Sequence, residues 1–136
     1  MSFLDLIKSK EKIKPQLVAT PEWGELNGRV YIKHLNATDR VAFFEAAFNQ
    51  KAYEGAAFQA FTAAFCSCDI DGNRLFNDTD WKSLQEEPGS VIERISEEAD
   101  TLNCLTVLAR ETAKKNYGKI EDSGDTPKSV ESSDAV

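Results

Sequence analysis

The chain has 136 residues, 41% of them hydrophobic, and its 23 acidic side chains outnumber the 16 basic ones for a formal net charge of −7. This length supports one hydrophobic core, so we expect a single domain over residues 1–117 followed by a tail. An acidic chain without a basic cluster repels a phosphate backbone, and no apolar run reaches the roughly 20 residues of a membrane span. Composition therefore argues against nucleic acid and membrane as partners.

The N-terminal residues are unlike a signal peptide, because Asp5 interrupts the apolar stretch and the lysines follow it. We therefore expect the protein to stay in the cytoplasm where it is made. Residues 2–13 carry Phe3, Leu6 and Ile7 at helical spacing, but the segment is short and lysine-rich, so a helix and a frayed end both fit the pattern.

A β-hairpin is predicted at about residues 15–35. Residues 15–19 have an extended character, and Asn27-Gly28 is a strong turn signal. Residues 29–35 then alternate β-branched or aromatic with polar side chains. An isolated hairpin is only marginally stable, so we expect this one to pack against the rest of the domain.

Helices are predicted for residues 37–117. The first begins after Asn36, a good N-cap residue with Asp39 three positions on, and the run from Ala52 to Phe65 is rich in alanine, a strong helix former. Large apolar side chains recur at helical spacing in both helices, and we expect them to form the core. They are Val41, Phe44 and Phe48 in the first helix, and Phe58, Phe61 and Phe65 in the second.

The later helices are expected to be separated by turns. After the turn at residues 71–73, residues 77–80 are predicted to cap a short helix that Pro88-Gly89 ends. Ser90 is then predicted to cap a longer helix, and Thr106 to start a last one that ends near residue 117. The apolar residues of the short and the longer helix are Trp81 and Leu84, then Ile92, Ile95, Ala99 and Leu102.

The predicted fold class is therefore mainly α (α+β), with four to five helices and an N-terminal β-hairpin. Residues 118–136 are acidic and almost free of large apolar side chains, so they cannot offset the entropy of ordering. We expect them to form a disordered tail.

Catalytic chemistry has little support in the sequence. The chain has one histidine, His34, and lacks a G-x-S-x-G elbow, a glycine-rich phosphate loop and an H-E-x-x-H motif. The three cysteines, Cys66, Cys68 and Cys104, lack the spacing of zinc ligands and are expected to be free thiols in a reducing compartment. We therefore predict a non-enzymatic protein without a cofactor.

An acidic turn offers a weak calcium candidate. Ser67, Asp69, Asp71 and Asp78 fall at positions 1, 3, 5 and 12 of a calcium loop, with Gly72 at position 6. Ser67 replaces the usual first aspartate, and Asp78 is one carbon shorter than the usual bidentate glutamate. A plain turn stabilised by local hydrogen bonds is the preferred interpretation, and a calcium-responsive helical binding module is the alternative.

The two tryptophans have two interpretations. Trp23 at the hairpin tip and Trp81 on the short helix either fill the core, which we prefer, or anchor a partner, because aromatic side chains dominate interfaces. Together with Phe76 they are the candidate partner-binding residues.

The order of these motifs resembles the phage and prophage tail assembly chaperones over about residues 15–110. The tip Pro21–Gly24 precedes Val30–Leu35 and then a helix entered through Ala37–Arg40. Later come the turn Cys68–Asp78, a short helix with Leu84, and the segment Ile95–Asn103 leading into Leu105-Thr106.

This resemblance implies a protein of the host bacterial cytoplasm that binds the tail tape-measure protein, and tail-tube subunits as a further candidate partner. It also implies absence from the mature virion and a frameshift-extended form of the same protein. Leu75 and Phe76 would then dock on the core after the turn. Weak self-association is expected when the tape-measure protein is absent.

Overall fold

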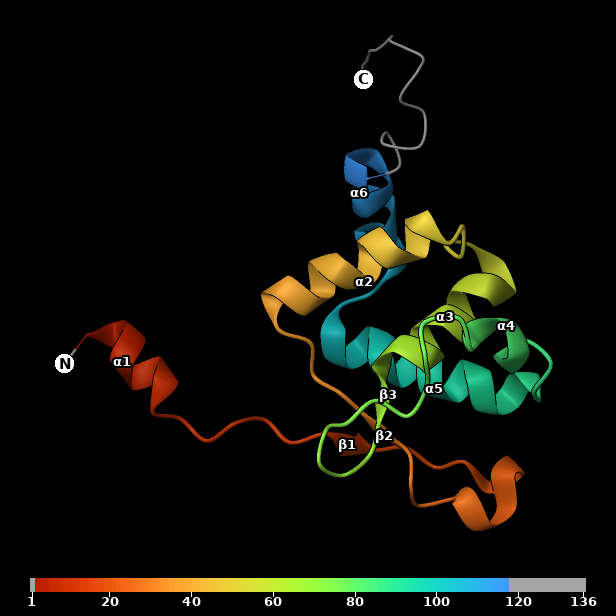
Figure 1. The fold of residues 1–136 in the computed structure, drawn as a ribbon. Helices are drawn as coiled ribbons and strands as arrows, with labels where there is room; N and C mark the ends of the chain where they lie inside the picture. The colour runs from red at the N-terminus through yellow and green to blue at the C-terminus, as the bar shows by residue number, and fades with distance from the viewer. Residues whose placement is uncertain (1, 118–136) are drawn as a thin grey trace, which may run out of the picture.

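Most of the regular structure is helical, and the remainder is three very short strands that form one sheet (Figure 1). The computed structural model describes residues 2–117, so the predicted tail, residues 118–136, lies outside the described residues. The helical segments are α1 (Phe3–Lys8), the 3-10 segment η1 (Pro21–Leu26), α2 (Ala37–Asn49), α3 (Gly55–Cys66), α4 (Trp81–Leu84), α5 (Gly89–Asn103) and α6 (Val107–Tyr117). The strands are β1 (Gln16–Leu17), β2 (Tyr31–Ile32) and β3 (Ser67–Cys68). The predicted mainly α (α+β) class is confirmed.

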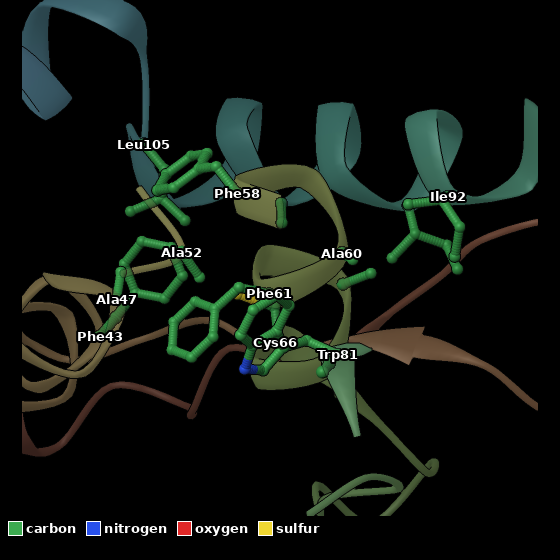
Figure 2. Close-up of a cluster of buried hydrophobic side chains, with 14 of the residues drawn as sticks. Phe43, Ala47, Ala52, Phe58, Ala60, Phe61, Cys66, Trp81, Ile92 and Leu105 are labelled. Carbon is green, nitrogen blue, oxygen red and sulfur yellow. The ribbon is translucent and has the colours of Figure 1, made fainter. Parts of the chain in front are cut away.

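The core is centred on Phe43 of α2, which is fully buried. Its ring centroid lies between 5.1 and 5.7 Å from those of four other phenylalanines, and Figure 2 shows it beside α3. Those four are Phe44, Phe58, Phe61 and Phe65. The predicted face of α2 was wrong in one position, because Val41 is 42% exposed while Phe43 takes the central place.

Helix α3 lies deep in the fold, with seven of its twelve residues buried, three of them alanines. Helix α5 packs against it through the predicted face, in which Ile92, Ile95 and Ala99 are buried and Leu102 is half-buried. Trp81 of α4 is also buried, at 7% exposure. Its indole Nε1–H donates a hydrogen bond to Oε1 of Gln50 at 2.6 Å, which satisfies the polar end of a buried ring.

The predicted hairpin is present as an antiparallel pair, but its connection differs. Gln16 pairs with Ile32, and η1 lies within the connection between the strands. Asn27 and Gly28 form a type II β-turn after η1, with the Arg29 N–H donating to the Leu26 carbonyl at 3.1 Å and Gly28 at φ 94°. The sheet order is β1-β2-β3, so a third strand that the sequence did not predict covers the second edge of β2.

The helix caps agree with the sequence at two positions and differ at two. The side chain of Asn36 accepts the Asp39 N–H at 2.7 Å, and that of Thr106 accepts the Ala109 N–H at 3.2 Å. Asp80 precedes α4, but its side chain makes no capping hydrogen bond to that helix, and its Oδ2 accepts the Asn77 N–H at 2.7 Å instead. Ser90 does not cap α5, which begins at Gly89. Its hydroxyl instead donates to a carboxylate of η1 at 2.7 Å, a long-range partner that sequence spacing cannot reveal.

Asn103, a buried residue at the end of α5, connects this helix to the segment between β2 and α2. Its side-chain oxygen accepts the Leu35 N–H at 2.8 Å, and its amide donates to the Lys33 carbonyl at 3.0 Å. These bonds satisfy two backbone groups that would otherwise lie unpaired in an irregular segment.

Candidate partner-binding surface

Exposed apolar side chains, rather than a polar cleft, are the most prominent surface feature of residues 2–117. Most of them lie in the N-terminal segment around α1 and in the turn between β3 and α4, and Leu26 lies at the corner where η1 meets α5. A hollow of about 360 Å³ also lies between α2 and α6 and is lined mainly by Val41, Phe44, Ala109, Ala113 and threonines. Exposed apolar groups of this kind are typical of sites that bind other macromolecules.

The turn after β3 is held in shape by one carboxylate. Oδ1 of Asp69 accepts the backbone N–H groups of Asp71 and Asn73, both at 2.9 Å, and the Asn73 carbonyl accepts the Asp69 N–H at 2.9 Å. These hydrogen bonds hold the pKa of Asp69 below its usual value, and the one from the Asn73 backbone makes the largest contribution. Gly72 lies at φ 89°, which a residue with a side chain rarely adopts. The turn thus has a fixed shape and presents Ile70, 65% exposed, near its tip.

The end of the turn is fastened to the core by Arg74. Its guanidinium pairs with Oδ1 of Asp78 at 2.6 Å and lies over the Phe65 ring at 4.9 Å from the centroid. Phe76 is half-buried and packs against the core, as the family resemblance implied. Leu75 was expected to dock as well, but it is 41% exposed and therefore adds to the apolar surface beside Ile70.

The calcium alternative is not supported by the arrangement of its residues. Ser67 is buried in β3, Asp69 is occupied by the backbone of its own turn, and Asp78 pairs with Arg74. Within residues 2–117 no group of three or more His, Cys, Asp or Glu side chains is arranged to hold a metal ion. The sequence positions matched a calcium loop, but Asp78 faces a guanidinium instead of the other carboxylates.

The two tryptophans have different environments. Trp81 fills the core, which agrees with the preferred interpretation and leaves it unavailable as a first contact for a partner. Trp23 is half-buried at the corner of η1 and α5, where its Nε1–H donates to Oε1 of Glu87 at 2.8 Å. Trp23 and Phe76 therefore remain partly accessible candidates.

The corner of η1 and α5 is fixed by an ion pair that the sequence analysis missed. Both carboxylate oxygens of Glu22 accept from the Arg94 guanidinium at 2.8 Å, and the Ser90 hydroxyl adds a third bond. The hydrogen bond from Arg94 is the main reason why the pKa of Glu22 falls to about 2. Sequence offered no signal for this contact, because the partners are about 70 residues apart.

The cysteines and the histidine lie in different environments. Cys66 and Cys68 are buried free thiols, and burial is the main reason why the pKa of each is raised, so both stay protonated near neutral pH. Cys104 is an exposed free thiol at the end of α5. His34 is half-buried between β2 and α2.

Comparison of the chain with protein-family models, with curated proteins and with solved structures gives no significant match. Among the described helices, none combines the length and apolar character needed to cross a membrane.

Proposed function

We propose that this chain is a tail assembly chaperone of a long-tailed phage or prophage, which binds the tape-measure protein without catalysing a reaction. The observation that carries this proposal is the ordered resemblance over about residues 15–110. Each motif is loose by itself, but they follow one another in the family's order. The tip Pro21–Gly24, the helix entry at Ala37–Arg40 and the turn Cys68–Asp78 supply most of that order.

The turn between β3 and α4 is the contact surface that fits this function best. It carries Ile70 and Leu75 exposed on a backbone that Asp69 fixes, with Phe76 at its base. A rigid apolar surface loses little entropy on binding, which favours a helical partner with apolar stripes. The net charge of −7 keeps the complex soluble through like-charge repulsion.

The site of action in this proposal is the host bacterial cytoplasm, during tail morphogenesis. A tape-measure protein is very long, so many copies of a small chaperone would bind it along its length by weak, repeated contacts. The chaperone would leave before the tail is complete and would be absent from the mature virion. Tail-tube subunits and a frameshift-extended form of the chain are further candidate partners.

Co-expression with the tape-measure protein encoded by the same phage tests the proposal. The tape-measure protein should become soluble and co-purify with this chain, and the double variant Ile70→Ser/Leu75→Ser should lose most of that yield. Val41→Ser is the matched control, because Val41 is as exposed as Leu75 but lies on α2. A tape-measure protein that stays insoluble, with no other tail protein co-purifying, would contradict the proposal.

A further inference from the structure

The N-terminal arm, residues 2–14, is a preformed apolar element that residues 15–117 leave uncovered. Among the side chains whose exposure the structure describes, half of the ten large, exposed apolar ones belong to it: Phe3, Leu4, Leu6, Ile7 and Ile13. Phe3 alone is 77% exposed, and no residue of α1 is buried. Helix α1 is nevertheless fixed by a reciprocal capping box, in which Ser2 and Asp5 exchange bonds of 3.1 and 3.2 Å. An ordered, exposed apolar helix is typical of a segment that binds a partner.

The arm also differs in charge from the rest of the molecule. It carries four lysines (Lys8, Lys10, Lys12 and Lys14) against Asp5 and Glu11, a net charge of +2 in a chain whose total is −7. Its partner surface should therefore be apolar at the centre and acidic at the edge.

The corner of η1 and α5 has this composition. Residues 21–28 and 85–98 together hold seven carboxylates and one base, Arg94, which Glu22 already neutralises. At the centre of the corner, Leu26 is 49% exposed and Trp23 is half-buried. The hollow between α2 and α6 suits the arm less well, because its single charged lining residue is Arg40.

We propose that the arm of one copy docks on the η1–α5 corner of a second copy. Phe3, Leu6 and Ile7, which share one face of α1, contact Trp23 and Leu26. The lysines of the arm face carboxylates at the edge of the corner, among them Glu25 and Glu86, which are both exposed.

The two surfaces meet in a head-to-tail contact. In Figure 1 the arm extends away from the helices, and η1 lies across the molecule from α1. The two surfaces are therefore different patches of each copy. When two copies join through such a contact, the pair still has one free arm and one free corner. An open chain of copies can then grow with concentration. This inference needs the chain alone and does not depend on the identity of any tail partner.

Sedimentation velocity of the full chain over a concentration series tests the proposal. We expect the weight-average mass to rise with concentration, with a dissociation constant on the order of micromolar, and to fall when salt is added. Charge reversal in the arm (Lys10→Glu/Lys12→Glu) or in the corner (Glu25→Lys/Glu86→Lys) should each weaken association at least tenfold. A mixture of these two variants should associate again, because the two new glutamates of one arm then face the two new lysines of the altered corner, while the unaltered arm faces the unaltered corner. Val41→Glu, in the hollow, should change nothing.

Four results of these experiments on the chain alone would overturn the proposal. They are a mass that does not depend on concentration, association that survives both charge reversals, no recovery in the mixture, and an arm that docks on its own corner, seen as protected arm amides in a monomer. A membrane role is checked with vesicles of phosphatidylserine and phosphatidylcholine. Binding to them through the arm by a chain that stays monomeric would also overturn it. Circular dichroism and melting temperature should be the same for every variant, since all the altered side chains are exposed.

Discussion

Replacing Phe43 by alanine should cost more stability than any other single truncation in the aromatic cluster. The side chain is fully buried, and its ring meets four others at centroid distances of 5.1–5.7 Å. Truncating a buried phenylalanine costs about 3–5 kcal/mol through lost transfer energy and the cavity left behind. Each aromatic pair contributes about 0.5–1.5 kcal/mol beyond burial, so Phe43→Ala should fall at the upper end of that range. Phe61→Ala, with two such pairs, should cost somewhat less.

Urea unfolding followed by tryptophan fluorescence measures this, with Trp81 in the core as the reporter. Phe43→Leu keeps most of the volume and should lose less, and Val41→Ala, on the exposed face of α2, should change stability by less than about 0.5 kcal/mol. A loss below about 1 kcal/mol for Phe43→Ala, or a loss for Val41→Ala that exceeds the one for Phe43→Ala, would refute the orientation of α2 in which Phe43 faces the core and Val41 faces solvent.

Four further predictions concern the polar groups. Asn103→Ala should lower the free energy of unfolding in urea by roughly 2 kcal/mol or more, because it leaves the Leu35 N–H and the Lys33 carbonyl without partners. The control Thr101→Ala, on the exposed face of α5, should be nearly neutral. Burial raises the pKa of Asp100 from 3.8 to about 6, so the folded state holds a proton that the unfolded state has lost, and stability should fall as pH rises from about 4 to 6. Asp100→Asn should abolish that fall and should be more stable than wild type at pH 7 by about 1–2 kcal/mol, a figure that allows for the solvent reaching this carboxylate. Equal dependence of stability on pH in wild type and Asp100→Asn would contradict this. The pKa of Glu22 falls from 4.5 to about 2 through the hydrogen bond from Arg94, so Glu22→Gln should lower the melting temperature at neutral pH, and its difference from wild type should shrink as pH drops from 4.5 to 2. Ellman's reagent should titrate one thiol, Cys104, in the native protein and three in denaturant, and rapid reaction of all three before unfolding would show that Cys66 or Cys68 is accessible.

The helices that form the core were predictable because their signals are local. The cap at Asn36, the alanine-rich run of α3 and the Ile92–Ile95–Ala99 face of α5 all act within one or two helical turns. The orientation of α2 was harder to predict. It has adjacent phenylalanines at 43 and 44 and adjacent alanines at 46 and 47, so its apolar pattern fits more than one face. Only packing against α3 selects the face that carries Phe43.

Long-range contacts account for what the sequence could not show. Strand β3 has two residues, too few for an alternating pattern, and it forms because β2 offers a free edge. Ser90 has the residue type of an N-cap, but a carboxylate of η1 takes its hydroxyl. The exposure of Leu75 also depends on long-range packing. The pattern of apolar side chains is the same whether or not another segment covers them, so the apolar surface of the turn became visible only in the folded chain.

A direct titration tests most sharply whether this chain binds the tape-measure protein through the turn between β3 and α4. A fluorescently labelled helical fragment of the tape-measure protein is titrated with wild type, with Ile70→Ser/Leu75→Ser and with Val41→Ser. We expect saturable binding to wild type and to Val41→Ser with matching affinity, and at least tenfold weaker binding to the turn variant, because the turn loses both exposed apolar contacts. Equal affinity for all three would place the contact elsewhere, and no binding by wild type to fragments covering the whole tape-measure protein would contradict the chaperone function.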